Sequence, residues 1–366
     1  MKPSLLLCAL LAACGGKADD TSGTDGAAPL AVATWNVGLA YGFVPYSPER
    51  APQVYEAVAA LDADVVCLDE VWTQADIAAI QAAAASTFPY SAVEFTQEEG
   101  ATGEPACTAE EAEPLRVCAE ANCTGSDDLT SCVLSYCAEE FGALSDECTA
   151  CAAANVGLND VAAIIEVCTS GSGTMSWGGH NGLLLLSRQE LVDPSYQSFD
   201  SWLVQRGVLG ATVGGVEVTC THIAAELSVP AYGGTVYGSY GEENAAQLSG
   251  ALAFLEARPG ERKVLLGDLN VGPAVGSLEG ELADNWALTA GWSDPNVEGD
   301  APFCTWCAEN VLTGSSGDRA IDHVLVSGLS ASSPSRISDA PITVSGADGE
   351  VSVFLSDHFG MRALVQ

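Results

Sequence analysis

Residues 264–270 read VLLGDLN, an apolar run that ends in an aspartate and an asparagine. Because Val264, Leu265 and Leu266 are apolar at successive positions, the run predicts a strand that is covered on both faces. The expected strand spans 263–269, which leaves Asp268 and Asn270 at its carboxyl end. An Asp-x-Asn after a strand is more often a turn than a site. The stretch therefore predicts a strand in a sheet covered on both faces. Whether Asp268 and Asn270 form part of a site depends on the other polar residues of the chain.

The chain outside residues 96–179 alternates short apolar strands with helical stretches, which is the pattern of an α/β fold. Ser47 is the expected N-cap of the first helix, with Pro48 in its first turn. Helices come both early and late, so we expect two sheets packed face to face with helices outside. Strands are expected at 30–37, 64–68, 90–95, 181–187, 206–213, 216–222, 263–269, 321–326 and 359–365, and helices at 48–61, 74–86 and 242–255.

Acidic, amide and imidazole side chains recur at the ends of these strands. Taken singly, each has a simple explanation as a turn, a rim carboxylate or a hydrogen-bonded histidine. The histidines, at positions 180, 222, 323 and 358, all fall in or beside these segments, which points to a shared site at the rim of the sheets. The polar set comprises Asn36, Glu70, His222, Asp268, Asn270, Asp322, Asp357 and His358.

Eight of the 14 cysteines fall within residues 107–168, inside an acidic segment at about 96–179 that interrupts the strand and helix alternation. In a secreted chain, this density indicates a disulfide framework, and we expect a mainly helical insertion. Helices are expected at 108–122 and 127–141. Antiparallel packing of those helices would pair Cys118 with Cys137 and Cys123 with Cys132, although sequence alone does not fix connectivity.

Six cysteines lie outside this insertion, of which Cys8 and Cys14 belong to the N-terminal segment and four belong to the expected α/β domain. Cys304 and Cys307 flank Thr-Trp with the spacing of a redox motif, but a local disulfide is preferred because no thioredoxin-like βαβ pattern precedes them. Cys67 and Cys220 lie in predicted buried strands. They are interpreted either as core thiols or as one cross-strand bridge.

The N-terminus has the features of an export signal. Lys2 precedes a short apolar run at residues 5–10, and small residues lead to Cys14. The pattern resembles a bacterial lipoprotein signal at 1–13, with Cys14 as the lipidated residue and 14–29 as a flexible tether. The alternative is an ordinary secretory signal. We expect a membrane-anchored, extracytoplasmic protein of the bacterial cell envelope, at the outer membrane or cell surface.

The charge is strongly acidic, with 12 Lys and Arg against 49 Asp and Glu, for a net charge of −37. Tight nonspecific binding of nucleic acid requires a basic stripe that displaces counterions, and this composition offers none. Hydrolysis of a phosphate ester remains compatible with an acidic surface. The sequence leaves the oligomeric state open.

Seven short motifs, taken together and in order, carry a family resemblance. They are TWNV, DEV, NGLLLLSR, TH, GDLN, IDHVLV and SDHFG, between about residues 31 and 364. The sequence resembles the endonuclease/exonuclease/phosphatase superfamily, the deoxyribonuclease-I-like phosphoesterases. The resemblance implies a four-layer α/β/β/α sandwich at 30–366, an active site at one rim between the sheets, and metal-dependent hydrolysis of a phosphodiester.

The resemblance also implies a metal site. Glu70 would bind a divalent cation, Mg²⁺ or else Mn²⁺ or Ca²⁺, with Asn36 and Asp357 assisting. Hard oxygen ligands of this kind suit such cations. Without a cation between them, carboxylates placed this close together would repel one another.

Catalytic roles follow from the same resemblance. Asp268 would orient the attacking water, and Asn270 would donate to a non-bridging phosphate oxygen. Asp322 would hold His358 and favour its imidazolium form, and His222 would face the phosphate. Asn181 stands where nucleases often carry a carboxylate that supports the first histidine, so a less basic His222 is expected.

Several other residues near the motifs have simpler structural explanations, and two other functional classes fit the sequence. His323 is interpreted as a packing or rim residue. Arg188, Arg206 and Arg319 are the basic residues near the motifs, and any of them could contact phosphate, but structural roles are preferred. The acidic charge favours smaller esters or lipid headgroups, as in a sphingomyelinase-like or inositol-phosphate-type esterase, over a nuclease. A catalytically silent module that binds through the cysteine-rich insertion is the alternative from another functional class.

Overall fold

The computed structural model describes residues 28–41, 43–93, 105–126, 129–145, 148–149, 151–152, 155, 161–170, 181–227, 231–346 and 349–366. The predicted signal, Cys14, most of the tether and His180 lie outside these residues. Within them, every helix is too short or too polar to cross a membrane.

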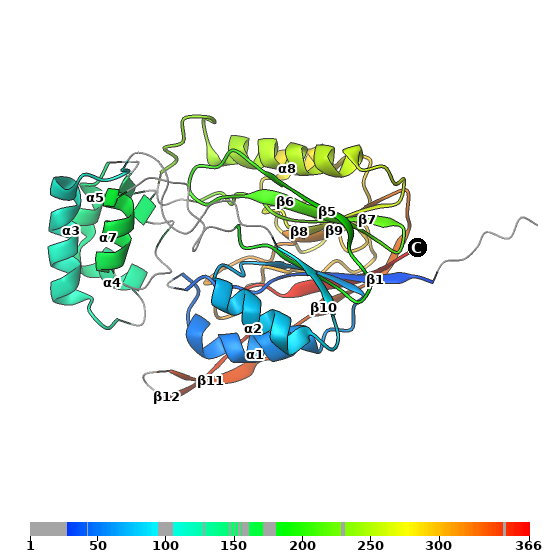
Figure 1. Cartoon of the computed structure of the whole chain (residues 1–366), viewed down its shortest axis with the longest axis horizontal. Coiled ribbons are helices and arrows are strands. Elements are labelled where there is room, and N and C mark those ends of the chain that lie inside the picture. The colour runs from blue at the N-terminus through cyan, green and yellow to red at the C-terminus, as the bar shows by residue number, and fades with distance from the viewer. Residues whose placement is uncertain are drawn as a thin grey trace, which may run out of the picture.

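The first sheet contains six strands among the described residues, in the order β10-β13-β1-β2-β4-β3. The central pair, β1 and β2, is parallel, and the other neighbours are antiparallel. Two helices, α1 (Ser47–Ala59) and α2 (Gln74–Ala84), cover its outer face (Figure 1). The strands are β1 (Leu30–Asn36), β2 (Val65–Asp69), β3 (Tyr90–Ala92), β4 (Leu184–Ser187), β10 (Ala331–Ile337) and β13 (Gly360–Val365).

The second sheet has the order β5-β6-β7-β8-β9, and α8 (Tyr240–Ala257) packs on its outer face. Strands β7 and β8 are parallel, so their carboxyl ends meet at one edge. Gly267 in β8 has φ of 149°, and a Cβ there would lie 1.7 Å from the Thr221 carbonyl oxygen. The strands are β5 (Val192–Ser198), β6 (Gly207–Val213), β7 (Val216–His222), β8 (Lys263–Asp268) and β9 (Asp322–Ser327).

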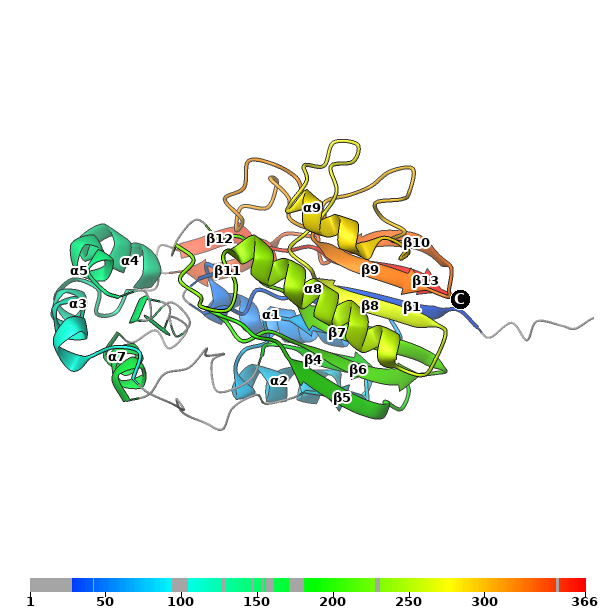
Figure 2. The same ribbon diagram turned by 90° about the horizontal axis from the view of Figure 1, so that it is seen from above.

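The predicted four-layer α/β/β/α sandwich is confirmed, as Figures 1 and 2 show. One apolar cluster, which includes Val32, Val218 and Leu266, lies between the two sheets. Two further clusters lie between each sheet and its helices. Because both faces are buried in strands such as β1, β2, β7 and β8, these strands show apolar runs in place of alternation. The Cys67–Cys220 disulfide joins β2 to β7 and therefore ties one sheet to the other.

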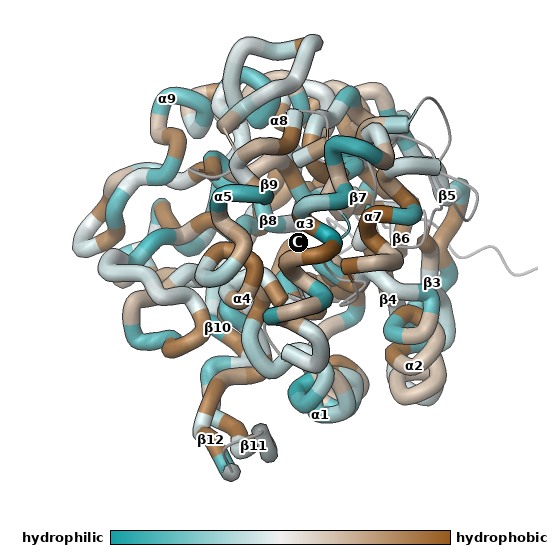
Figure 3. The backbone as a smooth tube through the Cα atoms, turned by 90° about the vertical axis from the view of Figure 1, so that its left-hand side faces the viewer, coloured by the Kyte–Doolittle hydropathy of each residue, from teal (hydrophilic) through white to brown (hydrophobic). Residues whose placement is uncertain are grey.

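The cysteine-rich segment is helical and contains α3 (Ala109–Asn122), α4 (Leu129–Tyr136), α5 (Ala138–Gly142) and α7 (Val161–Ser170). These four helices are called the insert module here. Thr108 and Glu111 form a capping box that starts α3. Figure 3 looks onto the module, which lies in front of one end of the sandwich. Figure 1 shows it beyond that same end.

The predicted cysteine pairs Cys118–Cys137 and Cys123–Cys132 are confirmed. Within a continuous helix, Cys123 would point away from Cys132. Cys123 instead follows the last residue of α3 and has a non-helical backbone, so its side chain can reach Cys132. The other disulfides among the described residues are Cys107–Cys148, Cys151–Cys168 and the expected local bridge Cys304–Cys307.

Two local predictions need correction. Ser47 does not cap α1: Tyr46 is the N-cap residue, with φ of 59°, and Ser47 Oγ donates to the Val44 carbonyl at 2.6 Å. The helix expected at 127–141 is divided at Cys137 into α4 and α5. Sequence patterning also missed the exposed strands β5 and β10 and the hairpin of β11 (Ile342–Gly346) and β12 (Gly349–Val353). A short helical segment, α9 (Ala283–Trp286) with a 3-10 turn at Ala287–Thr289, follows β8.

Candidate active site

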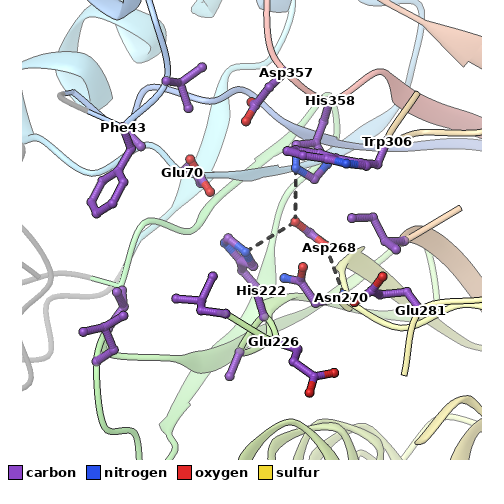
Figure 4. Close-up of a pocket in the computed structure, with 18 of the residues that line it drawn as sticks. Phe43, Glu70, His222, Glu226, Asp268, Asn270, Glu281, Trp306, Asp357 and His358 are labelled. Carbon is purple, nitrogen blue, oxygen red and sulfur yellow. Dashed lines mark hydrogen bonds and ion pairs between the residues drawn. The ribbon is translucent and has the colours of Figure 1, made fainter. Parts of the chain in front are cut away.

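Strands β1, β2, β7 and β8 all end at the side of the sandwich that faces the insert module. A pocket of about 480 Å³ opens there between the two sheets. Figure 4 shows its polar side chains converging from both sheets. All eight residues of the predicted polar set line the pocket or bond to a residue that lines it. They are Asn36, Glu70, His222, Asp268, Asn270, Asp322, Asp357 and His358.

Asp268 lies at the centre of this arrangement and is buried. Its Oδ1 accepts a hydrogen bond from the backbone of Asn270 at 3.0 Å, and its Oδ2 accepts one from Asn36 Nδ2 at 3.0 Å. The imidazoles of His222 and His358 lie 3.4 and 3.7 Å from Oδ2. Burial, and then the negative charge of Asp322, raises the pKa of Asp268 to about 7. A carboxylate with this pKa can exchange a proton with water near neutral pH.

The predicted His358–Asp322 pair is present. Nδ1 of His358 lies 2.8 Å from Asp322 Oδ2, and both side chains are buried. Burial lowers the pKa of His358, but the charges of Asp322 and Asp268 outweigh this effect and raise the pKa well above its usual value. His358 is therefore an imidazolium near neutral pH, held by carboxylates on both ring nitrogens.

His222 differs in its charge. Burial lowers the pKa of His222 well below its usual value, and the positive charges of Arg206 and His358 lower it further. It is therefore neutral near pH 7, in line with the less basic imidazole expected from the sequence. Its Nδ1 is buried and has no hydrogen-bond partner among the described residues. Asn181 does not supply one, because its Oδ1 accepts from the backbone of Leu183.

Glu70 and Asp357 form an acidic corner of the pocket, which Figure 4 shows next to His358. Burial, followed by the negative charge of Asp357, raises the pKa of Glu70. Glu70 Oε2 is buried without a hydrogen-bond partner in the described part of the chain. An unpartnered buried carboxylate oxygen beside a second carboxylate fits a hard divalent cation. The chain therefore offers two oxygen donors for such an ion at this corner.

Asn36 is oriented as a hydrogen-bond donor. Its Oδ1 accepts from the backbone of Gly38 at 3.0 Å, and its Nδ2 donates to both Glu70 and Asp268. Gly38 has φ of 56°, and a Cβ there would lie 2.4 Å from Asp357 Oδ1. A glycine at this position lets the loop after β1 approach the acidic corner closely.

Arg206 is a site residue for which the sequence analysis preferred a structural role. Its side chain is buried, lines the pocket and stacks on the Trp72 ring at 5.7 Å. No described residue accepts a hydrogen bond from its Nη1. Arg188 does not line the pocket and forms an ion pair with Asp64. Arg319 does line the pocket, but it forms ion pairs with Glu279 and Glu281. An unpaired, buried guanidinium aimed into a pocket suits an anionic ligand.

Asn270 adds an amide to the pocket and also anchors a neighbouring loop. Its Nδ2 donates to the Ile223 carbonyl at 3.0 Å, and its backbone has φ of 48°. His323, by contrast, is buried away from the pocket lining. Its ring nitrogens lie 2.7 Å from Asp294 Oδ2 and 2.8 Å from the Val271 carbonyl oxygen. This arrangement agrees with the packing role expected for it.

Two supporting groups were missed by sequence reasoning. Asp69, next to Glu70, accepts a hydrogen bond from the Asp268 backbone at 3.0 Å and so connects β2 to β8. Trp306, between the two cysteines of the local disulfide, packs its ring 4.8 Å from that of His358. The DE pair at the end of β2 was a sequence signal for Asp69, whereas the Cys304–Cys307 spacing gave no sign of contact with a histidine.

Comparisons with known proteins agree with this fold. A model described as the Endonuclease/Exonuclease/phosphatase family matches residues 33–358. Among curated proteins, no sequence matches this chain. Sphingomyelinase C from Streptomyces griseocarneus is similar in structure, with a TM-score of 0.52 and 19% identity over 92% of this chain and 99% of that chain.

Two other solved structures each cover the same shares of the two chains, 92% and 99%, at 14% identity. One is a mutant of the beta toxin from Staphylococcus aureus with bound magnesium ions, with a TM-score of 0.55. The other is TDP2 from D. rerio complexed with a single-strand DNA product, with a TM-score of 0.54. At these identities, the likeness establishes a shared fold.

Proposed function

This chain belongs to the endonuclease/exonuclease/phosphatase family and is a hydrolase of phosphoester bonds, and we propose that it hydrolyses a phosphodiester with the help of a divalent cation. The observation that carries the proposal is the convergence of two carboxylates, two histidines and one unpaired arginine on one pocket. They are Glu70, Asp357, His222, His358 and Arg206. The set combines a place for a cation with positive groups for a phosphate.

The acidic corner of Glu70 and Asp357 would hold the cation, with Asn36 fixing the Glu70 carboxylate. A bound divalent cation would supply charge neutralisation at a phosphoryl oxygen. Magnesium is proposed because two carboxylates are a sufficient protein contribution for that ion. The magnesium ions in the beta toxin structure, which shares this fold, support the choice.

The remaining groups would act on the phosphate and on water. Arg206 would bind a non-bridging oxygen, and an amide hydrogen of Asn270 would donate to another. Asp268 would orient a water molecule and accept its proton as the water oxygen bonds to phosphorus and the ester phosphorus–oxygen bond breaks. The His358 imidazolium would stabilise the negative charge that grows during this step. His222 would contribute a neutral hydrogen-bond donor.

The charge of the chain bears on the substrate. With a net charge of −37, a long polyanion would meet repulsion along the surface outside the pocket. We therefore propose a small or amphiphilic ester in preference to DNA or RNA, although one structural neighbour was solved with a DNA product. Six disulfides in the described residues support an extracytoplasmic location. Lipidation of Cys14 would anchor the protein to the membrane.

The test is magnesium-dependent release of 4-nitrophenol from bis-4-nitrophenyl phosphate, followed by plasmid DNA, sphingomyelin and inositol phosphates. We expect turnover that EDTA abolishes and that Mg²⁺ restores. His358→Ala and Asp268→Ala should each lower kcat by about 10²- to 10⁴-fold, because each removes a group that acts on the transferred proton or on charge in the transition state.

Two controls support the interpretation. Circular dichroism and thermal unfolding should show that both variants keep the fold. Arg188→Ala, which changes an arginine outside the pocket, should leave kcat unaltered. Near-normal rates in either pocket variant would contradict the roles given to Asp268 and His358. Failure to cleave any ester with Mg²⁺, Mn²⁺ or Ca²⁺ would favour a binding module in place of an enzyme.

A further inference from the structure

The insert module contains an apolar cavity of about 170 Å³ that is partly open to solvent. Its walls come from α3, α4, α5 and α7 and from the segments between them, and they include Leu115, Leu129, Val133, Phe141, Leu144 and Ile164. Thr130 is the one residue with a hydroxyl among the described lining residues. An engineered apolar cavity of about 150 Å³ in another protein stays dry and takes up benzene. A cavity of this size and lining therefore accepts a hydrocarbon group in preference to water.

The disulfides hold this cavity open. Cys107, Cys148 and Cys168 line it, and the bridges Cys107–Cys148 and Cys151–Cys168 tie their segments together. An empty apolar cavity lowers stability, and an unconstrained helical module would relax to reduce it. The covalent framework limits that relaxation, so the space persists in the absence of an occupant.

The cavity is adjacent to the catalytic pocket. Phe43, in the loop after β1, lines both the cavity and the pocket, and its side chain is 50% exposed. Figure 4 shows Phe43 at the edge of the pocket near Glu70. Val44 and Leu227 add apolar surface to the pocket wall. Phe43 is therefore an apolar side chain shared by the catalytic pocket and the cavity of the insert module.

We propose that this cavity binds the hydrocarbon chain of a phosphate ester whose phosphate lies in the catalytic pocket. The proposal rests on the proposed function and narrows its substrate class to alkyl or acyl phosphodiesters. A nucleic acid offers no hydrocarbon group for this cavity, and the net charge of −37 opposes its approach. An amphiphilic ester would occupy both sites, with its phosphate in the pocket and its hydrocarbon chain in the cavity.

The experiment compares 4-nitrophenyl phosphodiesters that carry methyl, butyl, octyl or dodecyl chains, each below its critical micelle concentration and with Mg²⁺ present. We expect kcat/KM to rise roughly threefold to fourfold for each methylene that enters the cavity, because each buried methylene favours binding. The rise should level off once the cavity is full. A kcat/KM that is independent of chain length would overturn the proposal.

Variants that block the cavity test whether a chain-length preference arises there or from apolar residues elsewhere on the surface. Ala152 lines the cavity, so Ala152→Trp should fill it and bring the ratio of octyl to methyl kcat/KM close to one. Thr130→Phe provides a second, smaller obstruction at another wall. Ala121→Trp is the matched control, because Ala121 is exposed on α3, and it should keep the wild-type ratio. If Ala121→Trp also brought the ratio of octyl to methyl kcat/KM close to one, the effect of Ala152→Trp would not show that the cavity binds the chain.

Direct binding distinguishes the two proposals. A fluorescent dansyl-undecanoate probe should bind the wild-type chain and Asp268→Asn and should be displaced by the octyl ester, but should not bind Ala152→Trp. Probe binding with no ester cleaved would support the cavity and refute the phosphodiesterase. Cleavage of the methyl ester without probe binding and without chain-length preference would refute the cavity and leave the phosphodiesterase standing.

Discussion

The role proposed for Arg206 depends on the groups that surround its side chain. Its guanidinium is buried between Trp72 and the acidic groups of the pocket, yet its Nη1 has no acceptor among the described residues. A buried charge without a hydrogen-bond partner costs stability, so its presence is best explained by an anion that binds there. This explanation yields a prediction about substrate binding.

Arg206→Ala should raise KM about 10- to 100-fold for bis-4-nitrophenyl phosphate, because it removes charged hydrogen bonds to a non-bridging oxygen. Arg206→Lys should recover part of this loss, since it keeps the charge but loses the planar fork. Steady-state kinetics on both variants, with isothermal titration of inorganic phosphate into each, tests the prediction. An unchanged phosphate affinity in Arg206→Ala would assign the arginine a structural role.

His323 shows a different consequence of burial. Both ring nitrogens face acceptors, Asp294 and the Val271 carbonyl, so the imidazolium form satisfies both contacts. Burial lowers the pKa of His323, but the bond and charge of Asp294 outweigh this and the pKa is raised. A raised pKa in the folded state gives stability that is present below the unfolded pKa of about 6.5 and is lost as pH rises through the folded pKa.

We therefore expect His323→Gln to lower the free energy of unfolding by about 1–2 kcal/mol at pH 6 and by less at pH 9. Urea unfolding of wild type and variant across this range measures the difference. The wild-type and variant curves should converge as pH rises. A difference that grows with pH would contradict the protonated state assigned to His323.

At the scale of elements, the loop of Cys304–Cys307 holds the His358–Asp322 pair in place. Thr305 Oγ1 accepts hydrogen bonds from the backbone of Ile321 and Asp322, each at 3.1 Å. The backbone of Phe359, next to His358, donates to the Thr305 carbonyl at 2.8 Å. The disulfide closes this loop on both sides of Thr305 and Trp306.

Replacing both cysteines, in Cys304→Ser/Cys307→Ser, should lower kcat by up to about 10²-fold with a smaller change in KM, because the loop positions groups that act in the chemical step. The matched control is Cys118→Ser/Cys137→Ser, which removes a disulfide of the insert module and should leave kcat on the small ester unchanged. Kinetics with bis-4-nitrophenyl phosphate, together with circular dichroism, provides the readout. Equal losses in both double variants would point to general destabilisation.

Elements differ in how well the sequence predicted them. Strands β1, β2, β7 and β8 carry long apolar runs because both faces are buried, and their expected bounds lie within two residues of the observed ones. Strands β5 and β10 are largely exposed, contain proline and lack an apolar period. β5 pairs with the next strand, β6, and β10 pairs with β13, but neither exposed strand carries an apolar pattern that would mark it as a strand.

At the scale of the whole molecule, the Cys67–Cys220 bridge joins the two sheets across a sequence separation of 153 residues. Cys67→Ala/Cys220→Ala should lower the free energy of unfolding by about 2–5 kcal/mol, because a cross-link over a long loop restricts the unfolded chain. Denaturant unfolding under non-reducing conditions measures this change. A loss below 1 kcal/mol would indicate that the packed core between the sheets, and not the bridge, holds them together.

The sequence by itself determined the order of buried strands and the polar residues that end them, and it predicted two disulfides of the insert module that the structure confirms. These features follow from local periodicity, local turns and cysteine spacing, which do not depend on how distant segments pack together. Only the tertiary structure decided that Arg206 faces the pocket, that His222 is neutral while His358 is charged, and that an apolar cavity adjoins the site. Burial and electrostatic interaction depend on distances between distant segments, and folding alone sets those distances.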